Sequence, residues 1–213
     1  MAAINPPRVT APGCRGGARQ SGISMIEVLV SLLLIVVGLL GLVGLQVRMQ
    51  QAEFESYQRA QALVLMADMA DRVHTQLLTA TCFAFSNPDG TGWVGTSATA
   101  TPSCAVSNAA NNTNAVSIMN EWQSQLLGAA ETKGGVSVGA ILGARGCVYY
   151  DPTSALLDPT AVAIPGTGLY TVAISWQGTV DTFAPTVNCA NGQYGTETKR
   201  RTVSTSFRLA KLN

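Results

Sequence analysis

RQSGISMIEVLVSLLLIVVGLLGLVGLQ, residues 19–46, is the stretch that decides the fold. Within it, residues 28–45 carry no charged side chain, and Glu27 is the only ionisable residue between Ile23 and Leu45. Since a helix rises by 1.5 Å per residue, the segment from Ile23 to Leu45 would span about 34 Å, enough to cross the hydrocarbon core of a bilayer. The stretch therefore predicts one membrane-spanning helix near the N-terminus.

The segment before the apolar run is hydrophilic and basic. Residues 1–22 contain no acid and three basic side chains, Arg8, Arg15 and Arg19. Only Arg48 follows the apolar run closely, so the asymmetry places the leader in the cytoplasm and the C-terminal portion outside. In an ordinary secretory signal a small-residue cleavage site follows the apolar region. Here Ser21-Gly22 precedes it, so cleavage at Gly22 would make the apolar helix the new N-terminus.

The charge of the whole chain gives little indication of a partner. Its 213 residues have a formal net charge of +1, and 12% of them are charged. Without the leader, 10 basic and 12 acidic residues remain, a net charge of −2. The one basic run, Lys199-Arg200-Arg201, is weak evidence for DNA binding, since basic residues often protect an edge strand from aggregation. DNA is therefore an unlikely partner.

The residues around Gly22 resemble a known processing signal. Gly22 followed by Ile23-Ser24-Met25-Ile26-Glu27 is similar to the class III signal of type IV prepilins, with a glycine, an apolar first residue and a glutamate fifth. The resemblance implies that a prepilin peptidase cuts between Gly22 and Ile23 and methylates the new amine of Ile23. Isoleucine replaces the usual phenylalanine. The continuation SLLLIVVGLLGLVGLQ resembles the branch of minor pilins called type IV pilus modification protein PilV.

Glu27 is the residue of this segment that most needs an explanation. A carboxylate costs roughly 2.5–3.5 kcal/mol at the centre of a membrane helix and less near an end. Glu27 lies one turn into the processed helix, where the positive N-terminal end of the helix dipole favours its negative charge. A free amine at Ile23 of a neighbouring, staggered subunit would pair with it strongly at low dielectric. The resemblance assigns Glu27 this assembly role; the alternative is an acid that only reaches the cytoplasmic headgroups.

The helix is expected to continue well beyond the apolar run. No proline occurs between Ile23 and Asn87, and residues 46–79 have an amphipathic pattern. We expect one helix over residues 23–79, with residues 23–45 in lipid or in a filament core and residues 46–79 on a domain. The resemblance implies the α+β lollipop fold of pilins, in which this helix packs on a small antiparallel sheet.

Three glycines recur at every third position of the apolar run, Gly38, Gly41 and Gly44. Small residues permit close packing between helices. Glycine also weakens a helix by about 1 kcal/mol relative to alanine, so the segment could unwind on assembly. Ordinary glycine frequency in membrane helices is a third explanation. We favour close packing slightly, because the proline of many major pilins near Gly44 is absent here.

Residues 80–213 are predicted to form the globular domain. A turn region, residues 82–95, and a loop, residues 96–112, precede a helix in TNAVSIMNEWQSQLLGAAE, capped by Asn111, Thr113 or Asn114. Four strands follow in VSVGAIL, GCVYY, LYTVAISWQ and RTVSTSFRLA, as an antiparallel meander with one face on the long helix. The predicted inward residues include Trp122 and two alternating sets, Tyr170, Val172, Ile174 and Trp176, and Val203, Thr205, Phe207 and Leu209.

The cysteines indicate an oxidising compartment for this domain. Cys14 lies in the leader, and an even number lies downstream: Cys82, Cys104, Cys147 and Cys189. Of three possible connectivities we expect neighbour pairing, Cys82 with Cys104 and Cys147 with Cys189. Each bridge would contribute roughly 3 kcal/mol. Buried free thiols are the alternative. The resemblance also implies a C-terminal loop closed by a disulfide.

No catalytic or cofactor motif is present, since the chain lacks G-x-S-x-G, H-E-x-x-H, P-loop and G-x-G-x-x-G sequences. His74 is the single histidine, expected to face solvent or cap the helix, and Asp151, Asp158 and Asp181 are read as solvated turn formers. We expect neither an enzyme nor a cofactor.

The resemblance implies a minor pilin that helps prime or modify a type IV pilus, supporting twitching motility and attachment. The chain would be a single-pass inner-membrane protein with a periplasmic C-terminal domain before it enters the pilus. Its expected partners are the prepilin peptidase, other major and minor pilins, the inner-membrane assembly platform, and membrane lipid before assembly. Two alternatives are a minor pseudopilin of a type II secretion system and a membrane-tethered periplasmic binding module that never polymerises.

Overall fold

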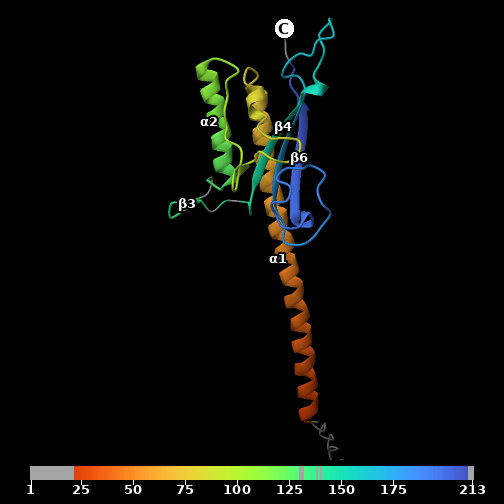
Figure 1. The fold of residues 1–213 in the computed structure, drawn as a ribbon. Coiled ribbons are helices and arrows are strands. Elements are labelled where there is room, and N and C mark those ends of the chain that lie inside the picture. The colour runs from red at the N-terminus through yellow and green to blue at the C-terminus, as the bar shows by residue number, and fades with distance from the viewer. Residues whose placement is uncertain (1–21, 130–131, 138, 140, 211–213) are drawn as a thin grey trace, which may run out of the picture. The chain divides into compact units, whose positions relative to one another are not determined.

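The computed structural model describes residues 22–129, 132–137, 139 and 141–210. They group into two compact units, one before Arg48 and one from Arg48 onward. Of the expected leader, residues 1–22, only Gly22 falls within the described residues, so Cys14 and the leader arginines lie outside them. The expected α+β class is confirmed, because a long N-terminal helix packs on an antiparallel sheet of four strands (Figure 1).

The first helix, α1, runs from Met25 to Thr75 and is shorter at both ends than the expected range of residues 23–79. At its C-terminal end the chain tightens into turns. The amide of Gln76 bonds to the carbonyl of Val73 and that of Thr79 to Gln76, at 3.2 and 2.9 Å. A short 3₁₀ helix, Ala80–Phe83, follows, so the helical pattern continues with tighter turns instead of as α-helix.

From Arg48 onward α1 has one buried face. Its buried residues recur at helical spacing: Gln58, Ala62, Met66, Met69, Ala70 and Val73. The second helix, α2 (Ala109–Leu126), buries Ala115, Met119, Trp122 and Leu126. The indole nitrogen of Trp122 donates to the carbonyl of Leu65, at 2.9 Å, and this bond ties the two helices together. The prediction that Trp122 belongs to the core is confirmed.

The start and end of α2 were predicted wrongly. The helix is capped by Asn108, whose side chain accepts from the amide of Asn111 at 2.9 Å. The cap therefore precedes Asn111, Thr113 and Asn114, the three residues proposed from the sequence. Four asparagines within seven residues all have a good capping side chain, so local chemistry alone does not select among them.

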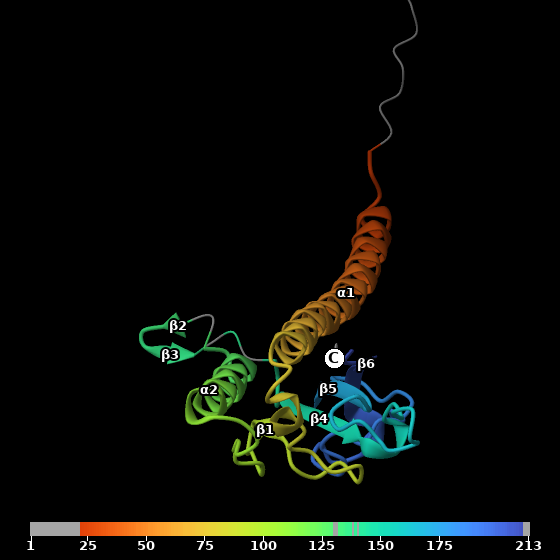
Figure 2. The ribbon, with the colours of Figure 1, turned by 90° about the horizontal axis from the view of Figure 1, so that it is seen from above.

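The sheet consists of β1 (Val94–Gly95), β4 (Arg145–Asp151), β5 (Leu169–Gln177) and β6 (Arg200–Arg208) in the order β1-β4-β5-β6. All three pairings are antiparallel. Short 3₁₀ helices, Pro152–Ser154 and Glu197–Lys199, precede β5 and β6. The helix α2 lies on the β1 side of the sheet, while β6 forms the opposite edge (Figure 2).

One of the four predicted strands is absent from this sheet. Among its described residues, the segment VSVGAIL contributes only β3 (Val136–Ser137), which pairs with β2 (Thr132–Lys133) in a separate hairpin. Gly134 and Gly135 join these strands with φ angles of +61° and +81°. Two consecutive residues with positive φ form the tight turn that folds a strand back on its neighbour. The two glycines therefore make β3 pair with the neighbouring β2, and β1 is the fourth strand of the main sheet.

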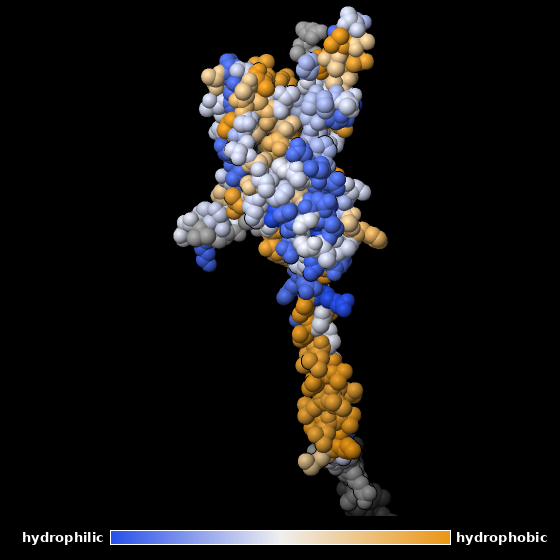
Figure 3. All heavy atoms as spheres, viewed as in Figure 1, coloured by the Kyte–Doolittle hydropathy of each residue, from blue (hydrophilic) through white to orange (hydrophobic). Residues whose placement is uncertain are grey.

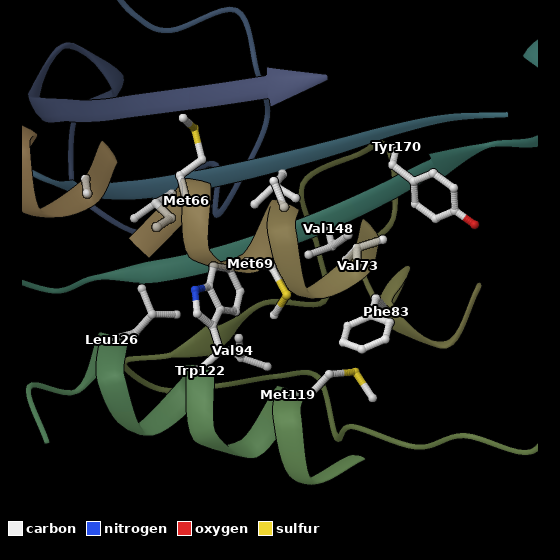
Figure 4. Close-up of a cluster of buried hydrophobic side chains, with 14 of the residues drawn as sticks. Met66, Met69, Val73, Phe83, Val94, Met119, Trp122, Leu126, Val148 and Tyr170 are labelled. Carbon is white, nitrogen blue, oxygen red and sulfur yellow. The ribbon is translucent and has the colours of Figure 1, made fainter. Parts of the chain in front are cut away.

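The main core lies between the sheet and the two helices (Figure 4). Of the predicted inward set on β5, Tyr170, Val172, Ile174 and Trp176 are all buried there, and so are Val203 and Leu209. Gly146 on β4 leaves room for the ring of Trp122, because a Cβ at this position would overlap that ring. His74 is exposed, as predicted, and its ring lies against that of Phe207 at 4.3 Å between centroids, with the two planes tilted by 31°.

The opposite sheet face is also partly buried, which the alternating pattern did not predict. Ala173 and Ser175 are inaccessible because the C-terminal loop, residues 178–199, covers them with Cys189, Ala190 and Tyr194. The hydroxyl of Ser175 donates to the carbonyl of Cys189 at 2.9 Å. Both expected disulfides, Cys82–Cys104 and Cys147–Cys189, are confirmed, and the second attaches this loop to β4.

Arg200 holds the C-terminal loop from inside. Its side chain is 2% exposed and pairs with the carboxylate of Glu197 at 2.6 Å. It also donates to the carbonyls of Val187 and Pro185, at 2.5 and 3.3 Å. Neither of the two roles considered for the run Lys199-Arg200-Arg201, contact with DNA and protection of an edge strand, fits Arg200, since a buried, paired guanidinium is unavailable to an external partner.

Glu55 attaches the same loop to α1. Its carboxylate accepts from the amide and hydroxyl of Thr179, at 2.9 and 2.6 Å, and from the amide of Val180 at 3.4 Å. Arg201 lies 3.6 Å away. Burial raises the pKa of Glu55, but the Thr179 bonds, the Arg201 charge and the Val180 amide together lower it below its ordinary value. These contacts define the Glu55 clasp.

The glycine at position 146 is testable by adding one methyl group. In Gly146→Ala the new Cβ would overlap the Trp122 ring and lie 2.7 Å from a methyl carbon of Leu126. We expect a loss of about 1–3 kcal/mol in the free energy of unfolding, the usual cost of overpacking a core. Denaturant titration of the full chain in detergent measures this, with the exposed Ser204→Ala as the control. Equal stability of the two variants would contradict the packing argument.

The Glu55 clasp predicts a dependence of stability on pH. A carboxylate with a lowered folded pKa stabilises the fold above its unfolded pKa of 4.5, and this contribution is lost as pH falls through the folded value. Glu55→Gln should therefore be less stable than the native chain by about 1 kcal/mol near pH 7, with the difference shrinking below about pH 4. The matched control is Glu53→Gln. A difference between Glu55→Gln and the native chain that stays constant across this range would argue against the clasp.

Candidate membrane and assembly segment

The segment from Gly22 to Val47 is exposed at every position in the single chain. It contains a helical window long and apolar enough to cross a membrane, and none of that window is buried. Figure 3 shows apolar atoms covering the visible surface of this part of α1. A helix that is apolar all round needs lipid or other apolar helices around it. The described chain supplies neither, so this segment is the candidate functional site.

The predicted processing residues lie just outside the helix. Gly22, Ile23 and Ser24 are not helical, and α1 begins at Met25. The carbonyl of Ser24 accepts the first bonds of the helix, from the amides of Glu27 and Val28, at 3.0 and 3.3 Å. Ile23 is 77% exposed. The peptide bond between Gly22 and Ile23 is therefore accessible and free of helical hydrogen bonds, as a cleaved bond must be.

Glu27 lies in the first turn of α1, where the helix dipole favours a negative charge. It is the only ionisable side chain between Gly22 and Val47. Within the described part of the chain its carboxylate forms no hydrogen bond or ion pair. Because the surrounding side chains are apolar, a partner for this charge would have to come from outside the described residues.

The three glycines form a slanting line along α1 in an unbroken helix. A Cβ built at Gly38, Gly41 or Gly44 meets no atom within 4 Å, so in the single chain all three face open space. Their missing side chains therefore serve no packing within the described residues. Close packing against another helix and unwinding on assembly both stay predictions.

The exposed apolar surface of α1 extends beyond the apolar run. Phe54, Tyr57 and Val64 are exposed and lie near one another around the helix, away from the buried face that begins at Gln58. The hydroxyl of Tyr57 accepts from the side-chain amide of Gln61 at 2.8 Å. This line of side chains leaves one side of the helix free for a partner along the domain as well as before it.

Asp151 and Asp158 form turns, as predicted, whereas Asp181 bonds a residue 17 positions away. Asp151 accepts from the amide of Thr153 at 2.9 Å, and Asp158 from that of Thr160 at 2.8 Å. Hydrogen bonds from the side chains of these threonines and from nearby backbone amides lower the pKa of both carboxyls. Asp181 accepts from the hydroxyl of Thr198 at 2.7 Å. Among the described residues, no three His, Cys, Asp or Glu side chains gather into a metal site.

The sequence pattern indicates the apolar segment and its carboxylate but gives no sign of the residues that organise the C-terminal loop. Glu55 and Arg200 carry out that role through contacts with residues 124 and 13 positions away. Glu55 is one of several polar residues on an amphipathic helix, and Arg200 is one of three adjacent basic residues. Neither local pattern predicts such contacts. Only the position of the loop against α1 and β6 reveals them.

Comparisons with known proteins found no relative of this chain. No protein-family model, no curated protein and no solved structure matches the chain.

Proposed function

We propose that the chain is a minor pilin, similar to type IV pilus modification protein PilV, which helps prime or modify the assembly of a type IV pilus. The observation that carries this proposal is the fully exposed apolar part of α1 with Glu27 as its single charge. Such a helix is stable in a bilayer before assembly and among neighbouring helices afterwards. One surface thus suits both states of a filament subunit.

The proposal begins with removal of the leader. Cleavage between Gly22 and Ile23 would leave an apolar residue with a free, then methylated, amine two residues before α1. The exposure of Ile23 supports access by a prepilin peptidase in the membrane. The hydrophilic leader would keep this bond on the cytoplasmic side.

Glu27 would then pair with the amine at Ile23 of an adjacent subunit. The Glu27 carboxylate has no ionic partner among the described residues, and an unpaired charge in an apolar bundle is strongly unfavourable. A staggered neighbour brings its terminal amine to the same depth and neutralises the charge. This ion pair would fix the stagger between neighbouring subunits, since only one stagger brings the Glu27 carboxylate and the Ile23 amine together.

The domain from Arg48 onward would form the part exposed on the pilus, where twitching motility and attachment depend on it. Its two disulfides suit a periplasmic and then extracellular location. The expected partners are other major and minor pilins, the assembly platform in the inner membrane, and lipid before assembly. The pseudopilin alternative shares every one of these features.

Processing is tested by the intact mass of the protein purified from its own membranes. We expect the mass of residues 23–213 plus one methyl group, with four hydrogens gained on reduction because two disulfides are present. The control is Gly22→Val, which should retain the leader, since a β-branched side chain at the cut obstructs the peptidase. A native protein that retains residues 1–22 would refute the pilin proposal and favour a membrane-tethered binding module that does not polymerise.

The role of Glu27 is tested in cells by three variants. Glu27→Ala should insert in the membrane normally but reduce incorporation into pili by about tenfold or more, because a buried amine loses its partner. Glu27→Asp should retain part of the incorporation, and the control Glu53→Ala all of it. Undiminished incorporation of Glu27→Ala would refute the pairing. Deletion of the gene should abolish twitching and leave protein secretion intact; the reverse result would favour the pseudopilin.

A further inference from the structure

The C-terminal loop leaves one end of its sheet face open. At this end Tyr149 on β4 lies opposite Thr171 on β5, and Asp151 lies opposite Leu169. Because successive side chains of a strand point to opposite faces, all four lie on the face that the loop covers elsewhere. Tyr149 and Thr171 are only partly buried, and Asp151 is exposed. A pocket of about 560 Å³ lies over these four residues.

The residues that line this pocket come from segments that are fixed to one another. Val187 and Asn188 belong to the C-terminal loop, and Pro88 to an earlier turn. Arg200 donates to the carbonyl of Val187 at 2.5 Å, and the side-chain amide of Asn188 donates to that of Pro88 at 3.4 Å. The Cys147–Cys189 bridge attaches the loop to β4 next to these residues. The pocket is therefore formed before a ligand enters, which lowers the entropy cost of binding.

Several polar groups of the pocket have unused hydrogen-bonding capacity. Oδ1 of Asp151 accepts from the amide and the hydroxyl of Thr153, at 2.9 and 2.6 Å. Within the described part of the chain, its Oδ2 accepts no hydrogen bond, and neither does Oδ1 of Asn188. The Thr186 hydroxyl also lines the pocket and bonds to no described residue. The pocket thus offers a carboxylate and an amide oxygen as acceptors, and one hydroxyl that can donate or accept.

Apolar surface lies beside these polar groups. The ring of Tyr149 lines the pocket together with Pro88, Pro152, Leu169 and Val187. The Tyr149 hydroxyl is enclosed and has no partner among the described residues, so the ring is the part of this side chain that a ligand can contact. An aromatic face carries partial negative charge and attracts C–H groups that pack on it.

The charge of the pocket disfavours an anionic ligand. Asp151 is its only charged lining residue. Arg200 is buried and paired with Glu197. Arg208 pairs with Leu169 in the sheet, but it donates to the carbonyl of Ser154 and does not line the pocket. A phosphate or carboxylate would therefore meet a carboxylate without a facing cation.

We infer that this pocket binds a neutral carbohydrate of one or two pyranose rings. The apolar C–H face of a pyranose fits the Tyr149 ring, and its hydroxyls can donate to Asp151 and Asn188. The volume lies in the range of about 300–1,000 Å³ that is usual for small-molecule sites. This inference rests on the proposed function in one respect, since it gives a ligand class for attachment; the binding itself requires only the domain from Arg48 onward.

Binding is tested by saturation-transfer NMR on the full chain, in a detergent without a sugar headgroup. The probes are lactose, maltose and cellobiose, with glucuronic acid and spermidine as charged probes of each sign. We expect saturation transfer to the ring C–H protons of at least one disaccharide and weaker transfer to both charged probes. No transfer to any disaccharide, or stronger transfer to a charged probe, would overturn the inference.

Substitutions in the pocket locate the binding. Asp151→Asn should lower the affinity for the bound disaccharide by about tenfold, because a charged acceptor is replaced by a neutral one. Asp158→Asn is the matched control, since Asp158 forms the same kind of turn with a threonine but lies outside the pocket. Tyr149→Phe should retain the affinity and Tyr149→Ala should lose it. Equal affinity of the two asparagine variants would exclude this pocket as the binding site.

The two proposals fail separately. A chain that is cut after Gly22 and requires Glu27 for incorporation, but binds no disaccharide, leaves the pilin function intact and refutes the carbohydrate site. A chain that retains its leader but binds a disaccharide through Asp151 refutes the pilin function and supports the carbohydrate site on a tethered domain.

Discussion

The structure from Arg48 onward depends on burial of one face of α1. Met66, Met69 and Val73 insert between the sheet and α2, and each fully buried apolar side chain of this kind contributes about 1.5–3 kcal/mol. Two specific features make the fit possible. Gly146 leaves space for the Trp122 ring, and the Trp122 indole satisfies the carbonyl of Leu65 on α1. The sheet, α2 and the loops are all positioned relative to this helical face.

The second face of the sheet is covered by the C-terminal loop. The loop over it is fixed by the Cys147–Cys189 bridge at one point, by Arg200 along its interior and by Glu55 where it meets α1. These contacts differ in chemistry but act on the same segment. As a result the backbone on either side of Phe183 is anchored while the ring itself stays in solvent.

In the part of α1 before Arg48 the apolar side chains are exposed instead of buried. Its apolar side chains have no cover in the single chain, and Glu27 has no partner among the described residues. Lipid can cover the apolar surface, but it cannot satisfy the carboxylate as well as a cation of fixed register can. For a filament subunit this difference would provide both solubility in the membrane before assembly and selectivity during it.

Sequence alone determined the features that depend on local pattern. Hydrophobic length identified the membrane-competent helix, alternation identified β5 and β6 with their inward residues, and cysteine order led to both disulfide pairs. Tertiary structure decided what depends on distant partners. Asn108 caps α2 among several equivalent asparagines, the glycine pair removes β3 from the main sheet, and Arg200 is buried within a run that reads as exposed. The reason is that capping, strand pairing and burial of a charge are settled by which groups lie nearby in space, and the sequence encodes those neighbours only through the completed fold.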